Sequence, residues 1–145
     1  KSMETILHWL LFCQLEVKIQ MMMLMVVVEG KLDDVQKGEL DVLLGEAITN
    51  AFVHASQGGK IIIEQAVSDQ RIDLKIANQC DGASCNPCFA PDPEDLGESG
   101  RGCQMIKDLA KDLRSGGLKV DASYENPPNE GDPNGKTVFM FSLSW

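Results

Sequence analysis

The chain has 145 residues, 43% of them hydrophobic, and a formal net charge of −9 at pH 7. This length fits one globular domain with its own core, so residues 1–145 are predicted to form a single domain. The acidic balance disfavours contact with nucleic-acid phosphate or an anionic membrane surface, so neither is expected as a partner. Five cysteines, an odd number without other secretory features, favour reduced thiols in a cytoplasmic protein.

The most apolar run lies near the amino terminus, with MMMLMVVV at residues 21–28. This run is shorter than the roughly 20 residues that a membrane-spanning helix needs, and Glu16 and Lys18 interrupt the sequence before it. No small-residue cleavage site follows it, which argues against a signal peptide. We expect a buried strand or helix that ends near Gly30, with a homodimer interface as the alternative because flexible methionines suit an adaptable surface.

A helix is predicted from about residue 36 to 56, and it carries three polar residues at intervals of four. Glu46, Asn50 and His54 lie on one stripe at the edge of its apolar face. A carboxylate one turn from a carboxamide can orient a hydroxyl or a water, while the amide oxygen binds a Mg²⁺ ion shared with phosphate. His54 is expected only to pack or to cap the helix end. The apolar arc that would hold this helix against a sheet comprises Leu40, Leu43, Leu44, Ala47, Ile48, Ala51 and Phe52.

Two strands are predicted next, at residues 60–67 and 71–77, where β-branched residues and strict alternation favour an antiparallel hairpin under the helix. The stretch that follows Asn78 is rich in proline and glycine and has no periodicity, which is typical of a functional loop. A second helix is predicted from about residue 102 to 114. Two further strands are expected near residues 118–124 and 136–143.

A glycine cluster, GESGRG at residues 97–102, stands directly before the second helix. Glycines there let the backbone approach a ligand closely, and the free amides at a helix amino terminus favour phosphate. Arg101 is the best candidate for a cation that contacts phosphate, because its planar fork matches phosphate oxygens and the chain is otherwise acidic.

Four segments, EAITNAFVHA, IANQCDG, GESGRGCQMIKDL and GKTVFMF, occur in this order. They resemble the N box, the two glycine boxes and the final strand of the GHKL ATPases, over roughly residues 20–145. The residue sequence GESGRG and the short loop between the glycine boxes are most similar to the corresponding segments of the anti-sigma factor serine/threonine kinases. The resemblance implies an α+β Bergerat fold, a two-layer α/β sandwich with a mixed, mostly antiparallel sheet and helices on one face.

The resemblance also implies site residues. Glu46 would be the general base and Asn50 the Mg²⁺ ligand. The adenine amino group would be read by Asp81 or Asn78 with support from Thr137, and Asp81 is favoured because Asp-Gly matches the Asp-bearing box better. The first glycine box lacks its usual second glycine, so both readers remain open. The other residues implied to bind ATP, chiefly at its phosphates, are Gly82, Gly97, Ser99, Gly100, Arg101 and Gly102.

The function implied by the resemblance is an ATP- and Mg²⁺-dependent serine/threonine protein kinase. Such a kinase would phosphorylate an antagonist protein and sequester a sigma factor in a partner-switching system that regulates transcription. The alternative is a nucleotide-binding module without this activity, such as the catalytic fragment of a histidine kinase or a degenerate GHKL regulator. A histidine kinase needs a phosphoacceptor helix, and His8 lacks the acidic neighbour that usually accompanies a phosphoacceptor.

Overall fold

The computed structural model describes residues 3–54, 61–79, 98–125 and 136–145, and it describes the side chains of residues 15–53, 61–79, 103–125 and 137–145. After residue 30 the helices and strands follow the predicted order and lie close to the predicted ranges, and the amino-terminal segment, for which the sequence left a strand or a helix open, is a helix. In chain order they are α1 (Met3–Val27), α2 (Asp34–His54), β1 (Ile61–Val67), β2 (Arg71–Gln79), α3 (Glu98–Ser115), β3 (Lys119–Tyr124) and β4 (Lys136–Ser144).

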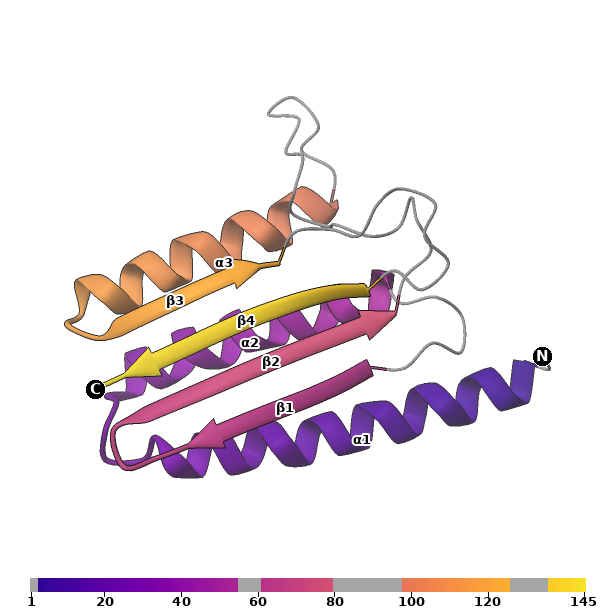
Figure 1. Cartoon of the computed structure of the whole chain (residues 1–145), viewed down its shortest axis with the longest axis horizontal. Helices are drawn as coiled ribbons and strands as arrows, with labels where there is room; N and C mark the ends of the chain where they lie inside the picture. Colours follow the sequence, from indigo (N-terminus) through magenta and orange to yellow (C-terminus); the bar gives the residue numbers. More distant parts are fainter. Residues whose placement is uncertain (1–2, 55–60, 80–97, 126–135) are drawn as a thin grey trace.

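The four described strands form one sheet in the order β1-β2-β4-β3. All neighbouring pairs among them are antiparallel, whereas the sequence predicts a mixed, mostly antiparallel sheet. The hairpin of β1 and β2 is confirmed, with Ile63 opposite Ile76. The chain returns through α3 to the edge strand β3, and β4 then inserts between β3 and β2 (Figure 1).

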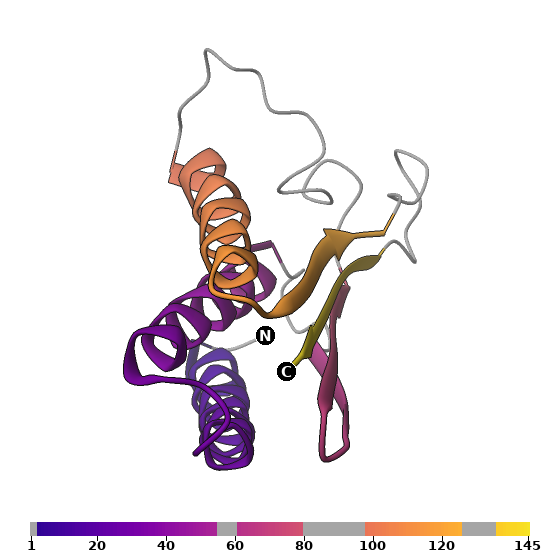
Figure 2. The ribbon, with the colours of Figure 1, turned by 90° about the vertical axis from the view of Figure 1, so that its left-hand side faces the viewer.

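The three helices cover one face of the sheet and leave the other face bare, as the end-on view in Figure 2 shows. Alternation along each strand explains this asymmetry, because every second residue of β2 from Ile72 onward is buried while Arg71, Asp73 and Lys75 point to the bare face. The α+β sandwich is thus confirmed. Each buried Leu, Ile or Phe contributes roughly 1.5–3 kcal/mol. The core includes Leu40, Leu43, Leu44, Ala47, Ala51, Ile72, Leu74, Ile76, Ile106, Ala110, Leu113, Phe139, Phe141 and Leu143.

The sequence caps α2 at its start with a reciprocal pair of hydrogen bonds. The backbone N–H of Gln36 donates to Asp33 Oδ1 at 2.7 Å, and the backbone N–H of Asp33 donates to Gln36 Oε1 at 3.0 Å. This capping box satisfies two amides that the helix itself cannot pair. Gly30, between α1 and α2, has φ of +77°, so the predicted glycine stop after the apolar run is confirmed.

Helix α1 buries only one of its faces. Val17 and Leu24 pack into the domain and are 8% and 1% exposed. The opposite face exposes a stripe at helical spacing, which is formed by Leu15, Ile19, Met22 and Val26. The expectation of a buried apolar run is therefore wrong for this outward face, since the sheet offers α1 a partner on one side only. No described helix is long and apolar enough to cross a membrane.

Candidate functional site

Three polar side chains are buried in the part of the chain that the structure describes. Asn50, Asn78 and Thr137 are 6%, 4% and 3% exposed. Asn50 lies near the end of α2, Asn78 near the end of β2 and Thr137 near the start of β4, and these three ends meet at one end of the sandwich (Figure 1). Burial of polar groups is costly unless they are hydrogen-bonded. The cluster therefore marks a candidate site, and all three residues are among those predicted from the sequence.

Asn78 and Thr137 are paired in register across β2 and β4. Both continue the inward alternation of their strands, so both face the helix layer. Among the described residues, Nδ2 of Asn78 is buried without a hydrogen-bond partner. An unpaired buried donor costs about 1–3 kcal/mol. This atom therefore fits a hydrogen-bond acceptor on a bound molecule, such as a ring nitrogen of a purine.

Asn50 is held from the sheet side. Its Nδ2 donates to the hydroxyl of Tyr124 at 3.3 Å and lies 3.9 Å from Sγ of Cys103. Burial raises the pKa of the Tyr124 phenol, and the hydrogen bond from Asn50 opposes this rise. Sequence reasoning missed Tyr124 and Cys103 as neighbours of Asn50. They lie 74 and 53 positions from it along the chain, and no helix or strand period relates residues so far apart. Glu46 is half-buried one turn before Asn50, as its spacing predicts.

Cys103, the sixth residue of α3, is disulfide-bonded, and its partner side chain lies outside the described residues. The expectation that the cysteines are reduced thiols is therefore wrong for Cys103. An odd number of cysteines requires one of them to be unpaired but does not prevent a pair. The pairing depends on how the fold brings two sulfurs together, which the spacing of cysteines along the chain does not report.

The other predicted site residues are less fully described. Asp81, Gly82 and Gly97 lie outside the described residues, and so does the side chain of His54. The structure starts α3 at Glu98, so residues 99–102 form part of its first turns rather than a loop before it, and their side chains are not described. The amino terminus of α3 lies at the same end of the sandwich as the ends of α2 and β2 (Figure 1). Its free amides and positive dipole end suit phosphate there.

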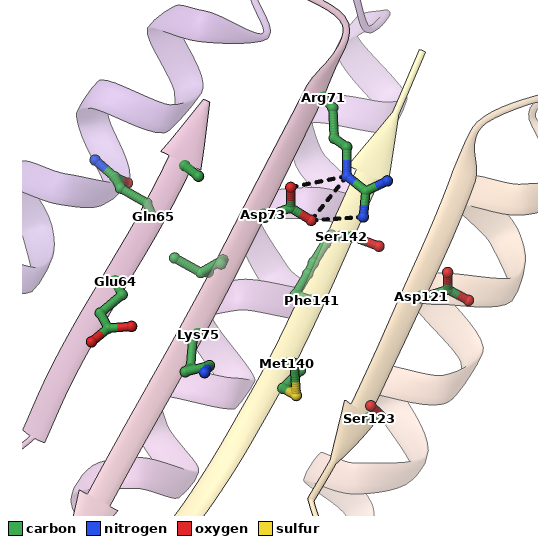
Figure 3. Close-up of a pocket in the computed structure, with 12 residues that line it drawn as sticks. Glu64, Gln65, Arg71, Asp73, Lys75, Asp121, Ser123, Met140, Phe141 and Ser142 are labelled. Atoms are coloured by element: carbon green, nitrogen blue, oxygen red, sulfur yellow. Dashed lines mark hydrogen bonds and ion pairs between the residues drawn. The ribbon is translucent and has the colours of Figure 1, made fainter. Parts of the chain in front are cut away.

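A shallow hollow on the bare face of the sheet is separate from this site (Figure 3). Its centre is an ion pair in which Arg71 contacts Asp73 at 2.9 Å, and both side chains are about half exposed. Glu64 stands opposite Lys75 on the neighbouring strand. Together with Asp121 on β3, these charged residues lie on the face of the sheet opposite Asn50 and Asn78, so this hollow is outside the candidate site.

Residues 17–124 match the histidine kinase-like ATPase domain family. The chain belongs to this family. The family is part of the GHKL superfamily, so the resemblance to GHKL ATPases is confirmed, and an ATP-binding domain of the kinase and ATPase type follows. The match ends at Tyr124 and includes Glu46, Asn50 and Asn78. Among curated proteins, none matches the chain.

Solved structures of histidine kinases share the fold. The catalytic domain of histidine kinase ThkA has a TM-score of 0.53 at 14% identity, over 88% of this chain and 91% of that one. The mycobacterial sensor histidine kinase MprB has a TM-score of 0.50 at 19% identity, over 74% and 71%. The Acinetobacter baumannii histidine kinase AdeS has a TM-score of 0.48 at 24% identity, over 74% of this chain but only 46% of its own. The chain thus spans about half the length of the AdeS structure.

Proposed function

We propose that this domain binds ATP with Mg²⁺ and acts as an anti-sigma factor serine/threonine kinase that phosphorylates an antagonist protein. The buried cluster of Asn50, Asn78 and Thr137 is the observation that supports nucleotide binding most directly. The GESGRG segment, most similar to the anti-sigma factor kinases, supports the finer assignment. A sigma factor and its antagonist would be the protein partners, and transcription the process that they regulate.

Adenine would be read by two residues rather than one. The unpaired Nδ2 of Asn78 is a donor, so it suits a ring nitrogen of adenine. The exocyclic amino group is itself a donor and needs an acceptor, a role that the carboxylate of Asp81 would fill. Thr137, in register with Asn78, would support this contact from β4. The two candidate adenine readers then have complementary rather than competing roles.

Phosphate and metal would lie between α2 and the start of α3. Asn50 Oδ1 would be the protein ligand of Mg²⁺, which prefers oxygen and is usually shared with substrate phosphates. Bound there, Mg²⁺ would neutralise phosphate charge. The amides of the glycine cluster, Gly97 to Gly102, and the guanidinium of Arg101 would hold the phosphate oxygens.

Glu46 would then act as the general base. Its carboxylate accepts the proton of the attacking serine or threonine hydroxyl while the new oxygen–phosphorus bond forms at the γ-phosphorus. The bond from that phosphorus to the β–γ bridging oxygen breaks at the same time, and ADP leaves. The half-buried position of Glu46, one turn before Asn50, supports this role.

A histidine-kinase-type module is the second candidate function, because the solved structures with this fold that are named above are histidine kinases. At their identities, this likeness shows the fold alone. The two candidate functions differ in the bond that is formed, an oxygen–phosphorus bond on serine or threonine or a nitrogen–phosphorus bond on histidine. Acid treatment distinguishes them, because phosphoserine survives acid whereas phosphohistidine is hydrolysed by it.

The deciding experiment is calorimetric titration with ATP and Mg²⁺, followed by transfer of labelled γ-phosphate to purified antagonist candidates. Acid-stable label on an antagonist supports the kinase proposal. ATP binding with label that is acid-labile would support the histidine-kinase alternative instead. If the protein binds no ATP with or without Mg²⁺, the proposal is wrong.

A further inference from the structure

The two ends of the Asn50 carboxamide lie in different environments. Nδ2 donates to the Tyr124 hydroxyl at 3.3 Å and approaches Sγ of Cys103 at 3.9 Å. Oδ1 makes no hydrogen bond to any described residue. One end of the amide is therefore fixed against β3 and α3, and the other end is available to a ligand.

Two acceptors determine which end of the amide faces the sheet. A half-turn of the carboxamide would exchange its oxygen and its NH₂ group. The sulfur of Cys103 is disulfide-bonded, so it has no S–H to donate and can only accept. The NH₂ orientation places a donor against this sulfur and against the Tyr124 oxygen, whereas the reverse orientation would place an oxygen against the sulfur lone pairs.

Tyr124 is itself well anchored. It is the last residue of β3 and lies in register opposite Phe139 of β4. The two ring centroids are 5.1 Å apart, and Phe139 is 1% exposed and packs edge-on against Phe141. The packing of the Tyr124, Phe139 and Phe141 rings fixes the position of the Tyr124 ring on the sheet. The Tyr124 hydroxyl is therefore held at a defined position beside α2.

We propose that Tyr124 is a positioning residue for Asn50, whose Nδ2 it holds so that Oδ1 is turned toward the metal and the phosphates. This rests on the proposed function, in which Oδ1 of Asn50 is the Mg²⁺ ligand. Mg²⁺ takes oxygen ligands with strict geometry, so an amide that is free to turn would present nitrogen part of the time. In this role Tyr124 acts through Asn50 and is not itself a ligand of the metal.

The test is Tyr124→Phe, which keeps the ring against Phe139 and removes only the hydroxyl. ATP affinity is measured by calorimetry with Mg²⁺ and again with EDTA. We expect affinity with Mg²⁺ to fall about two- to tenfold, the range for one lost hydrogen bond. Affinity in EDTA should stay at the parental value. A purely structural role for Tyr124 would lower both affinities together.

Ser123→Ala is the matched control, because Ser123 precedes Tyr124 on β3, is exposed and points to the other face. It should change neither affinity. In an Asn50→Ala background, Tyr124→Phe should have no further effect on Mg²⁺ dependence. The proposal is overturned if Tyr124→Phe keeps parental affinity with Mg²⁺, or loses equal affinity in both conditions. A parent protein that binds ATP in neither condition overturns the proposed function itself, which is a distinguishable result.

Discussion

Asn78 and Thr137 lie opposite each other across β2 and β4, both buried on the face that the helices cover. A strand interior normally carries apolar residues on such a face, as Ile72, Leu74 and Ile76 do on the same strand. On β2 and β4, the inward-facing positions are thus polar only at the end of β2, where Asn78 lies, and at the start of β4, where Thr137 lies. The Nδ2 of Asn78, which lacks a partner, shows that the donor of Asn78 does not serve the packing of the free protein.

The first prediction separates stability from binding at Asn78. Asn78→Leu has a similar size and removes the unpaired donor, so the free energy of unfolding without ligand should rise, by up to about 1–3 kcal/mol. ATP affinity should fall, since the proposed adenine contact is lost. Urea unfolding and calorimetric titration measure the two effects. Loss of stability without ligand would mean that Asn78 has a structural partner after all.

The second prediction concerns Glu46. Glu46→Gln keeps shape and hydrogen-bonding reach but removes the proton acceptor. ATP affinity should stay within about a few-fold while phosphoryl transfer falls about 10²- to 10⁴-fold, the usual contribution of a general base. Single-turnover transfer to an antagonist protein is the measurement. Asp41→Asn, an exposed change on the same helix, should leave both quantities unchanged. Transfer at the parental rate in Glu46→Gln would place the base elsewhere.

Much of this site was predictable because helix and strand periodicity are local. Glu46 and Asn50 share a stripe by spacing alone, and the structure confirms the helix that carries them. Asn50 is 6% exposed, which is deeper than the edge of the apolar face at which the sequence places it. The contact from Asn50 to Tyr124 joins residues 74 positions apart, so no local pattern reports it. The first expectation for α1, a buried apolar run, was wrong for its outward face for the same reason, and only the alternative of a dimer interface allowed for an exposed face. Hydropathy shows that a helix is apolar. Which of its faces are buried depends instead on how far the sheet extends beneath the helix, which the local sequence does not report.

The third prediction concerns the cysteines. With Cys103 in a disulfide, at least two of the five cysteines are oxidised, which leaves at most three thiols. Thiol titration of protein denatured without reductant should therefore find three or fewer, and five after reduction. Cys103→Ala provides the control, because it releases the partner sulfur. Five titratable thiols in the unreduced protein would contradict the disulfide.

The fourth prediction uses the fact that Tyr124 is the only tyrosine of the chain. Burial raises the pKa of its phenol above the ordinary value of 10.0. In an ultraviolet titration, the folded protein should ionise at a higher pH than the same protein in urea. The unfolded state then loses its proton first, so the stabilising contribution is complete below pH 10 and is lost as pH rises through the folded pKa. Coincident folded and unfolded titrations would show that the hydroxyl is solvated.

The last prediction concerns the exposed apolar stripe of α1. Leu15, Ile19, Met22 and Val26 follow one another at spacings of four, three and four, which is the seam of a coiled coil. Between Ile19 and Val28 the helix carries no charge, so this stripe is neutral on a protein of net charge −9. The same stripe on a second copy would cover it around a two-fold axis.

We therefore expect a homodimer through α1, with a mass near twice 15.9 kDa in sedimentation velocity. Met22 is 68% exposed at the middle of the stripe, so Met22→Glu places a charge in the interface without disturbing the core, and the mass should fall to that of one chain. Val35→Glu makes the same kind of change at a residue that is 70% exposed on α2, outside the stripe, and should leave the dimer intact. If the parent protein sediments as a single chain, or if Met22→Glu still dimerises, α1 is not the self-association surface. In the second case the two copies must meet through another face, such as the bare side of the sheet.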